Sequence, residues 1–303
     1  MQAMSGVQMG KRSMIGLEGV AGPVALTILA MISIQTGASI AKQLFPIVGA
    51  SGATAMRLAF AAVILVLATR PWRGGLGWAD WKRALPYGLV LGAMNLTFYN
   101  ALKTLPIGIA VALEFTGPLA VALFASRRAL DFAWIALAAA GLVVLLPITG
   151  AGGHVDPWGA MFALAAGLFW ALYIVFGQKA GKDGAVRTVT LGTVIAAVLV
   201  APVGIASAGA AMLTPAAIPL ALGVAILSTA LPYVLEMLAM TRLPAKTFGT
   251  LMSLEPAIGA LSGLLLLGET LGLLQWGAIG AIVAASLGAA LGAARPVAPA
   301  DPA

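Results

Sequence analysis

Four ionisable residues interrupt long apolar runs of this sequence: Arg57, Glu114, Glu236 and Glu255. A charge at the centre of a membrane span costs about 2.5–3.5 kcal/mol, so such residues face a bundle interior or water, usually with a partner. The alternative to a functional role is a structural one, in which Arg57 and one of the glutamates form an ion pair between two helices. Glu236 lies near the end of its run, so it could also reach the interface or pair with Lys246.

The balance of these charges suggests a chemistry. Three carboxylates and one arginine, all ionised, would leave an uncompensated negative charge inside the protein, so at least one carboxylate is expected to be protonated or to meet a cationic ligand. A carboxylate that exchanges a proton for a solute's ammonium group is the minimal requirement of a proton antiporter. Glu114, Glu255 and Glu236 are therefore the predicted proton-coupling residues.

Polar and aromatic residues at helical spacing accompany these charges. Gln35, Ser39 and Lys42 are spaced i, i+4, i+7, and three further pairs are spaced i, i+3 or i, i+4: Asn95 with Tyr99, Trp170 with Tyr173, and Tyr233 with Glu236. Such spacings place each set on one helix face. Aromatic rings with a few polar groups suit a small organic solute, and the alternative is packing or an interfacial aromatic belt. The predicted substrate-binding residues are Gln35, Arg57, Asn95, Tyr99, Glu114, Trp170, Tyr173 and Tyr233.

The composition indicates where these residues reside. Of 303 residues, 61% are hydrophobic and only 9% are charged, which excludes an ordinary soluble domain and a disordered chain. There is no cysteine, and the single histidine, His154, cannot build a zinc site alone. No phosphate-binding GxxxxGK[ST] loop is present. We therefore expect no metal, no cofactor and no enzymatic activity.

Ten apolar stretches of about 20 residues are long enough to cross a bilayer as helices. The predicted fold class is an all-α integral membrane protein with ten transmembrane helices. The predicted spans are 20–41, 50–69, 84–102, 106–126, 132–149, 158–177, 188–208, 216–240, 248–267 and 271–291. The apolar run after the basic residues of 1–19 resembles a signal peptide, but its length and the lack of a clear cleavage site favour a retained first helix.

The distribution of Lys and Arg predicts the orientation. With both termini in the cytoplasm, fourteen of the seventeen basic residues fall on the inner side, Lys42 and Lys103 fall on the outer side, and Arg57 lies within a span. This asymmetry is the positive-inside pattern. It explains the net charge of +7 through topology, so no nucleic-acid partner is expected.

An internal duplication is indicated by the prolines. Pro106 and Pro118 are each followed by another proline 138 residues later, at Pro244 and Pro256, and Lys42 and Lys179 are 137 residues apart. Chance similarity of apolar segments is the alternative. The predicted units are an N-terminal tail (1–19), two five-helix repeats (20–149 and 157–293) and a C-terminal tail (294–303).

An odd number of spans in each repeat inverts one repeat relative to the other, as in many secondary transporters. The lipid bilayer is thus a predicted partner, and the oligomeric state is left open. Pro118 and Pro256 are the predicted hinges, since a proline inside a helix frees a carbonyl and bends the axis.

Several segments resemble the bacterial threonine/homoserine exporter family of the drug/metabolite transporter (EamA-type) superfamily. They are 33–42 (SIQTGASIAK), 108–123 (GIAVALEFTGPLAVAL), 228–237 (STALPYVLEM) and 247–256 (TFGTLMSLEP). The resemblance extends from about the first span to the tenth. It implies an inner-membrane exporter of threonine, homoserine and related amino acids, with two five-helix repeats around a central cavity and the proton gradient as driving force.

Three alternatives to this function are considered. A broad-specificity efflux carrier for drugs or metabolites would use the same carboxylates without needing a residue for an amino-acid carboxylate. A passive pore is disfavoured by the isolated, rather than ringed, charges. A membrane enzyme is disfavoured because no set of nucleophile, base and orienting residue is present.

Overall fold

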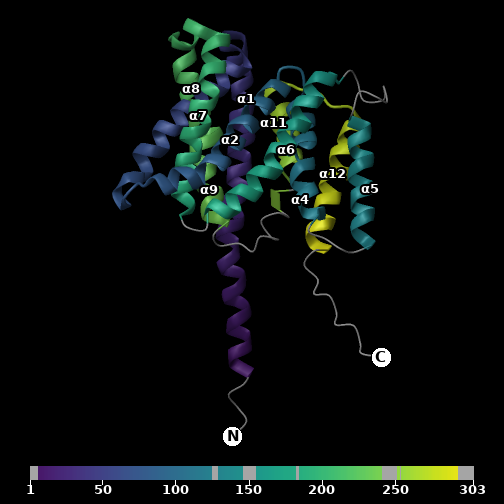
Figure 1. Cartoon of the computed structure of the whole chain (residues 1–303). Coiled ribbons are helices and arrows are strands. Elements are labelled where there is room, and N and C mark those ends of the chain that lie inside the picture. The colour runs from purple at the N-terminus through teal and green to yellow at the C-terminus, as the bar shows by residue number, and fades with distance from the viewer. Residues whose placement is uncertain are drawn as a thin grey trace.

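The computed structural model describes residues 6–124, 129–145, 155–181, 184–240, 251–252 and 254–292 (Figure 1). Within these ranges the chain forms helices joined by short connections, with no strand. Four helices among the described residues are long and apolar enough to cross a membrane, and further apolar helices are shorter. The structure is thus an all-helical membrane fold, and the count of ten spans stays a prediction. The predicted C-terminal tail, 294–303, lies outside the described residues.

Helix α1 (Gly6–Thr69) contains the first two predicted spans, separated by a sharp kink at Gly49. Gly49 has φ 67° and ψ 171°, a backbone conformation that is essentially restricted to glycine. Ser39 and Lys42 therefore belong to the part before the kink, and Arg57 belongs to the part after it.

The remainder of the first half comprises a short 3₁₀ turn η1 (Pro71–Gly74) and helices α2 (Trp78–Ala101), α3 (Ile107–Glu114), α4 (Thr116–Phe124) and α5 (Ala129–Leu145). Helices α3 and α4 divide the predicted span 106–126, with Phe115 between them. The cause is Pro118, which has no N–H to offer the carbonyl of Glu114 and whose ring crowds that carbonyl.

The second half follows a similar sequence of elements. It contains α6 (Pro157–Ala180), α7 (Ala185–Ala208), a 3₁₀ turn η4 (Gly209–Leu213), α8 (Ala217–Ala225), the π-helix η5 (Ile226–Ala230), α9 (Leu231–Met240), α11 (Glu255–Leu267) and α12 (Leu273–Gly292). Helix α11 begins at Glu255 with Pro256 in its first turn, where a missing N–H costs nothing. The first residues of the predicted span 248–267 lie outside the described ranges, apart from 251 and 252.

Close helix packing surrounds the centre of the molecule. Helix α1 packs against α7, α8, η5, α9 and α11, while α2 packs against α6 and α7, α3 against α11, and α5 against α12. Small residues permit this approach: a Cβ at Gly108 of α3 would lie only 2.6 Å from the Cβ of Ala260 in α11. In Figure 1, α5 and α12 lie side by side, and α1 begins on the side of the molecule where α12 ends.

Candidate functional site

A cavity of about 630 Å³, counted to its opening, lies among α1, α2, α3, α6, η5, α9 and α11. Every predicted substrate-binding and proton-coupling residue lines it, although those residues come from six helices. The full lining is Ile34, Gln35, Ala38, Arg57, Met94, Asn95, Phe98, Tyr99, Glu114, Trp170, Tyr173, Ser228, Tyr233, Glu236 and Glu255.

Arg57 is held by neutral oxygens rather than by a carboxylate. Its Nη1 donates to the carbonyl and Oγ of Ser228, at 3.2 and 3.1 Å, and to Oγ1 of Thr229 at 2.9 Å. Its Nη2 donates to Oδ1 of Asn95, and the guanidinium lies 4.5 Å from the ring centroid of Tyr99. Among the described residues Arg57 forms no salt bridge, which differs from the ion pair considered above. Its positive charge is therefore not cancelled by a direct contact.

The π-helix η5 explains why these oxygens are available. A π-helical turn breaks the regular backbone ladder and is frequent at functional sites. Here the carbonyl of Leu227 accepts from Oγ of Ser33 at 2.5 Å, and the carbonyl of Ser228 accepts from Arg57. Gly37 lets α1 approach η5 this closely, because a Cβ at Gly37 would lie 2.6 Å from the Cβ of Ser228.

Of the three glutamates that line the cavity, Glu255 is the one whose side chain has a hydrogen bond within the described residues. Its Oε1 accepts from Nε2 of Gln35 at 3.2 Å, and its Oε2 is buried without a partner. Nε of Arg57, the hydroxyl of Tyr99 and Oε1 of Gln35 are also buried and unpartnered. Since buried polar atoms are normally satisfied, four such atoms around one cavity indicate a place for a polar ligand or water.

Glu114 and Glu255 each lie where a helix is interrupted. Glu114 is the last residue of α3 and Glu255 is the first of α11. At both places the helical path of the backbone continues, since Phe115 and Leu254 keep helical backbone angles. Neither Glu114 nor Glu236 has a hydrogen-bond partner for its side chain within the described part of the chain.

Aromatic side chains form the apolar wall of the cavity. Trp170 packs edge-to-face against Phe115 with ring centroids 5.7 Å apart. The hydroxyl of Tyr87 donates to that of Tyr173 at 3.2 Å, with ring centroids 4.9 Å apart. Trp78 and Trp158 are instead 72% and 67% exposed, as an interfacial position requires.

The predicted hinges do not line the cavity. Pro118 lies just beyond the interruption at Phe115, and Pro256 lies at the start of α11. Their hinge role stays a prediction. Lys246 and His154 lie outside the described residues, and no group of metal-ligating side chains occurs in the ranges that are described.

Sequence reasoning missed part of the site. It did not select Ser228 and Thr229, because a serine and a threonine in an apolar run usually bond to their own helix, and no local pattern announces a π-helix. Ala38, Met94 and Phe98 were also missed. Helical periodicity could have found them, since Ala38 is three residues from Gln35, and Phe98 is three residues from Asn95.

Comparison with known proteins places the chain among transporters. The EamA-like transporter family matches residues 157–291. The threonine/homoserine exporter RhtA of Escherichia coli (strain K12) is 55% identical over 271 residues, which cover 89% of this chain and 91% of that protein. RhtA of Salmonella typhimurium (strain LT2) gives the same identity and coverage. The uncharacterized inner membrane transporter YedA of E. coli (strain K12) is 27% identical over 71% of this chain and 75% of its own.

A solved crystal structure with 19% sequence identity superposes with a TM-score of 0.62, covering 89% of this chain and 97% of the other. At that identity the likeness shows a shared fold. The extensive identity to RhtA carries more weight, because it spans nearly the whole length of both proteins. The chain therefore belongs to the EamA-like transporter family, within the family of the RhtA exporters.

Proposed function

We propose that this protein exports small amino acids, threonine and homoserine among them, from the bacterial cytoplasm. One observation carries the proposal: Arg57, Glu114 and Glu255 line the same buried cavity. A zwitterionic amino acid needs one cationic and one anionic partner, and both are present. The RhtA relatives, named as threonine/homoserine exporters, support the same substrate class.

The unpartnered atoms suggest how the substrate binds. Arg57 receives the substrate carboxylate, since its charge is not neutralised by a contacting carboxylate and its Nε is unpartnered. Glu255 receives the ammonium group through Oε2, while Gln35 holds its other oxygen. Trp170, Tyr173 and Tyr233 enclose the aliphatic part, and Asn95 and Tyr99 keep Arg57 in place.

Proton coupling is assigned to the carboxylates that line the cavity. Glu114 exchanges a proton, because it is buried and has no hydrogen-bond partner among the described residues, which disfavours its negative charge. Glu236, further along the cavity wall, passes protons to or from the inner side. When the substrate leaves, a proton taken up by these carboxylates replaces the positive charge that the ammonium group had placed beside them.

Alternating access is assigned to two inverted five-helix repeats, 20–149 and 157–293, that rock around the cavity. Several contacts support this arrangement, since α3 packs on α11, α5 on α12, and the part of α1 after Gly49 on α7. Each of these pairs joins corresponding positions of the two halves. Pro118 and Pro256, 138 residues apart beside the two interruptions, serve as hinges.

The proposed orientation places both termini in the cytoplasm and the chain in the inner membrane. The start of α1 and the end of α12 lie on the same side of the molecule (Figure 1), which supports a common side for both termini. The excess of Lys and Arg in the predicted loops of that side supports the cytoplasm as that side.

The direct test measures threonine and homoserine export by the full-length protein. Cells that lack their own exporters and overproduce this protein should tolerate excess threonine, and inverted membrane vesicles should accumulate labelled threonine only with a proton gradient. Accumulation that is unaffected by removing the gradient would argue for a passive pore. A lack of both tolerance and accumulation, with the protein present in the membrane, would contradict the proposed substrate class.

A further inference from the structure

Three polar contacts connect α1 with α11 and the connection after it. Gln35 Nε2 donates to Glu255 Oε1 at 3.2 Å, the hydroxyls of Ser39 and Ser262 lie 2.9 Å apart, and Lys42 Nζ donates to Glu269 Oε1 at 2.6 Å. The three α1 residues are those that the sequence places on one helix face. The contacts lead from the cavity to the end of α11, since only Gln35 and Glu255 line the cavity.

The last contact joins four segments. Besides Glu269, Lys42 Nζ donates to the carbonyl of Leu105 at 3.1 Å, and Oε2 of Glu269 accepts from the backbone N–H of Ile107 at 2.8 Å. Ile107 is the first residue of α3, where a carboxylate is favourable. The pair thus links α1, the turn before α3, the start of α3 and the α11–α12 connection. Side-chain exposure of 21% for Lys42 and 15% for Glu269 leaves the pair partly shielded from solvent.

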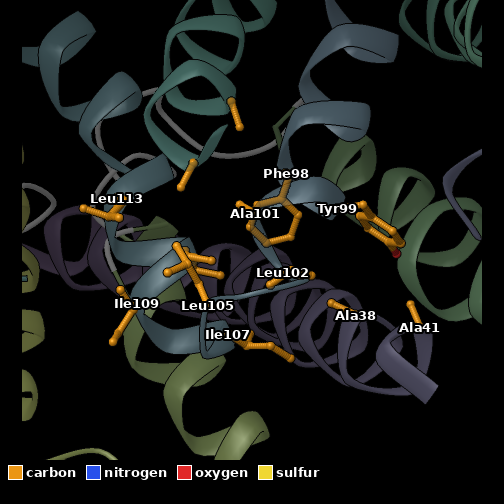
Figure 2. Packing of buried hydrophobic residues seen from close by; sticks show 14 of the residues in the cluster. Ala38, Ala41, Phe98, Tyr99, Ala101, Leu102, Leu105, Ile107, Ile109 and Leu113 are labelled. Carbon is orange, nitrogen blue, oxygen red and sulfur yellow. The ribbon is translucent and has the colours of Figure 1, made fainter. Parts of the chain in front are cut away.

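Buried apolar side chains of one cluster adjoin both the cavity and this ion pair. Figure 2 labels members of the cluster on α1, at the end of α2, in the turn before α3 and along α3. Tyr99, Leu102, Leu105 and Ile107 are at most 1% exposed, and Phe98 and Tyr99 also line the cavity. The cluster thus reaches from the cavity wall to Leu105 and Ile107, whose backbone groups contact the ion pair, so packed side chains and the ion pair lie between the cavity and the Lys42 end of this helix face.

From this arrangement we infer that Lys42 and Glu269 are the outer gate residues of transport, and that the gate is closed here. The inference rests on the proposed function, because a solute leaving toward the outside must separate α1 from α11 at this point. Lys42 lies on the side that the charge distribution predicts to be the outside. Opening breaks the ion pair and exposes the carbonyl of Leu105 and the N–H of Ile107 to water, which satisfies both.

The alternative is a structural ion pair that stays formed in every conformation. Such a pair would stabilise the fold without changing which side of the membrane the cavity faces. A gate makes a different demand: weakening it shifts the protein toward the state open to the outside, since a contact made in one state only biases the equilibrium.

Accessibility of a cavity residue distinguishes these roles. The natural chain has no cysteine, so Ala38→Cys supplies a single thiol in the cavity wall without further changes. Intact cells are treated from outside with a membrane-impermeant maleimide. The labelling rate should rise about tenfold when Lys42→Gln or Glu269→Gln is added. Lys103→Gln, at an exposed lysine of the same side, is the matched control, and Lys42→Arg should keep labelling low. Unchanged labelling in both gate variants overturns the inference.

A cross-link provides the second measurement. Lys42 and Glu269 are both replaced by cysteine, and the two thiols are joined by a reducible bifunctional reagent. The cross-link should lower the rate of threonine export at least about tenfold, and a reductant should restore the rate. Full export by the cross-linked protein overturns the gate. If labelling responds to the gate variants while no threonine is exported by the unmodified protein, the gate stands and the proposed substrate fails.

Discussion

Gln35 and Glu255 lie 220 residues apart in the sequence and are joined by one hydrogen bond at the cavity wall. The bond fixes one carboxylate oxygen of Glu255 on α1 and leaves the other buried and unpartnered. The position of this carboxylate therefore depends on the distance between α1 and α11. Any movement that separates these helices also changes the site at which an ammonium group would bind.

Replacement of Arg57 tests recognition of the substrate carboxylate. Arg57→Ala should reduce threonine export at least about a hundredfold, because a buried charge-assisted contact is lost. Arg57→Lys should restore little of it, since an ammonium group cannot reproduce the contacts of the guanidinium to Ser228, Thr229 and Asn95 together. Initial rates in inverted vesicles provide the measurement. Loss of threonine export with persistent efflux of organic cations would favour a broad-specificity carrier.

The carboxylates are tested by removing their charge while keeping their shape. Glu114→Gln should abolish accumulation driven by a proton gradient but allow exchange of labelled for unlabelled threonine, since exchange requires no net proton movement. Glu255→Gln should impair both, because Glu255 is proposed to hold the ammonium group. The two assays are run on the same reconstituted protein. Full gradient-driven transport by both variants removes the basis for proton coupling through these residues.

The hydroxyls that hold Arg57 should affect substrate affinity more than turnover. Thr229→Val and Ser228→Ala each remove one hydrogen bond to a charged group, and each should raise the KM for threonine about tenfold with little change in maximal rate. Thr193→Val is the matched control. Its hydroxyl is equally buried and bonds within its own helix, to the carbonyl of Val189. Equal effects at positions 193 and 229 would contradict a role in positioning Arg57.

The proposed hinge at Pro118 is tested by allowing the helix to continue. Pro118→Ala supplies an N–H for the carbonyl of Glu114, so it should favour a continuous helix through Phe115 and slow transport about tenfold without weakening binding. Pro86→Ala is the control, since Pro86 lies inside the uninterrupted helix α2. Binding by calorimetry and transport rates are compared. Unaltered transport by the Pro118 variant would remove the hinge assignment.

The proposed internal duplication predicts a second gate on the inner side. Lys179 follows Lys42 by 137 residues, and Asp131, near the start of α5, precedes Glu269 by 138 residues. Lys179 is exposed in this structure. Cysteines at positions 131 and 179 should cross-link faster when the outer gate is weakened by Glu269→Gln. Equal cross-linking rates with and without that substitution would speak against paired gates.

The sequence revealed the lining of the cavity better than the contacts within it. Charged residues in apolar runs and polar residues at helical spacing identified Arg57, Glu114, Glu255 and Gln35, because burial of such groups is costly without a polar interior. The partners of Arg57 were not foreseen, since they depend on the π-helix at Ser228. The partner of Lys42 was missed for a different reason: Glu269 lies in a connection, where a carboxylate is ordinarily solvated.

The kink at Gly49 has a mechanical consequence. Lys42 stands seven residues before it and Arg57 eight residues after it, on two arms of one helical segment. A Cβ at position 49 would meet no atom within 4 Å, so only the backbone angles demand glycine there. The part of this helical segment before the bend contacts α11, and the part after it packs on α7 and carries Arg57. If the proposed outer gate opens by a tilt of the first part away from α11, the bend would pass that tilt to the second part, so gate opening and displacement of the Arg57 guanidinium would be coupled.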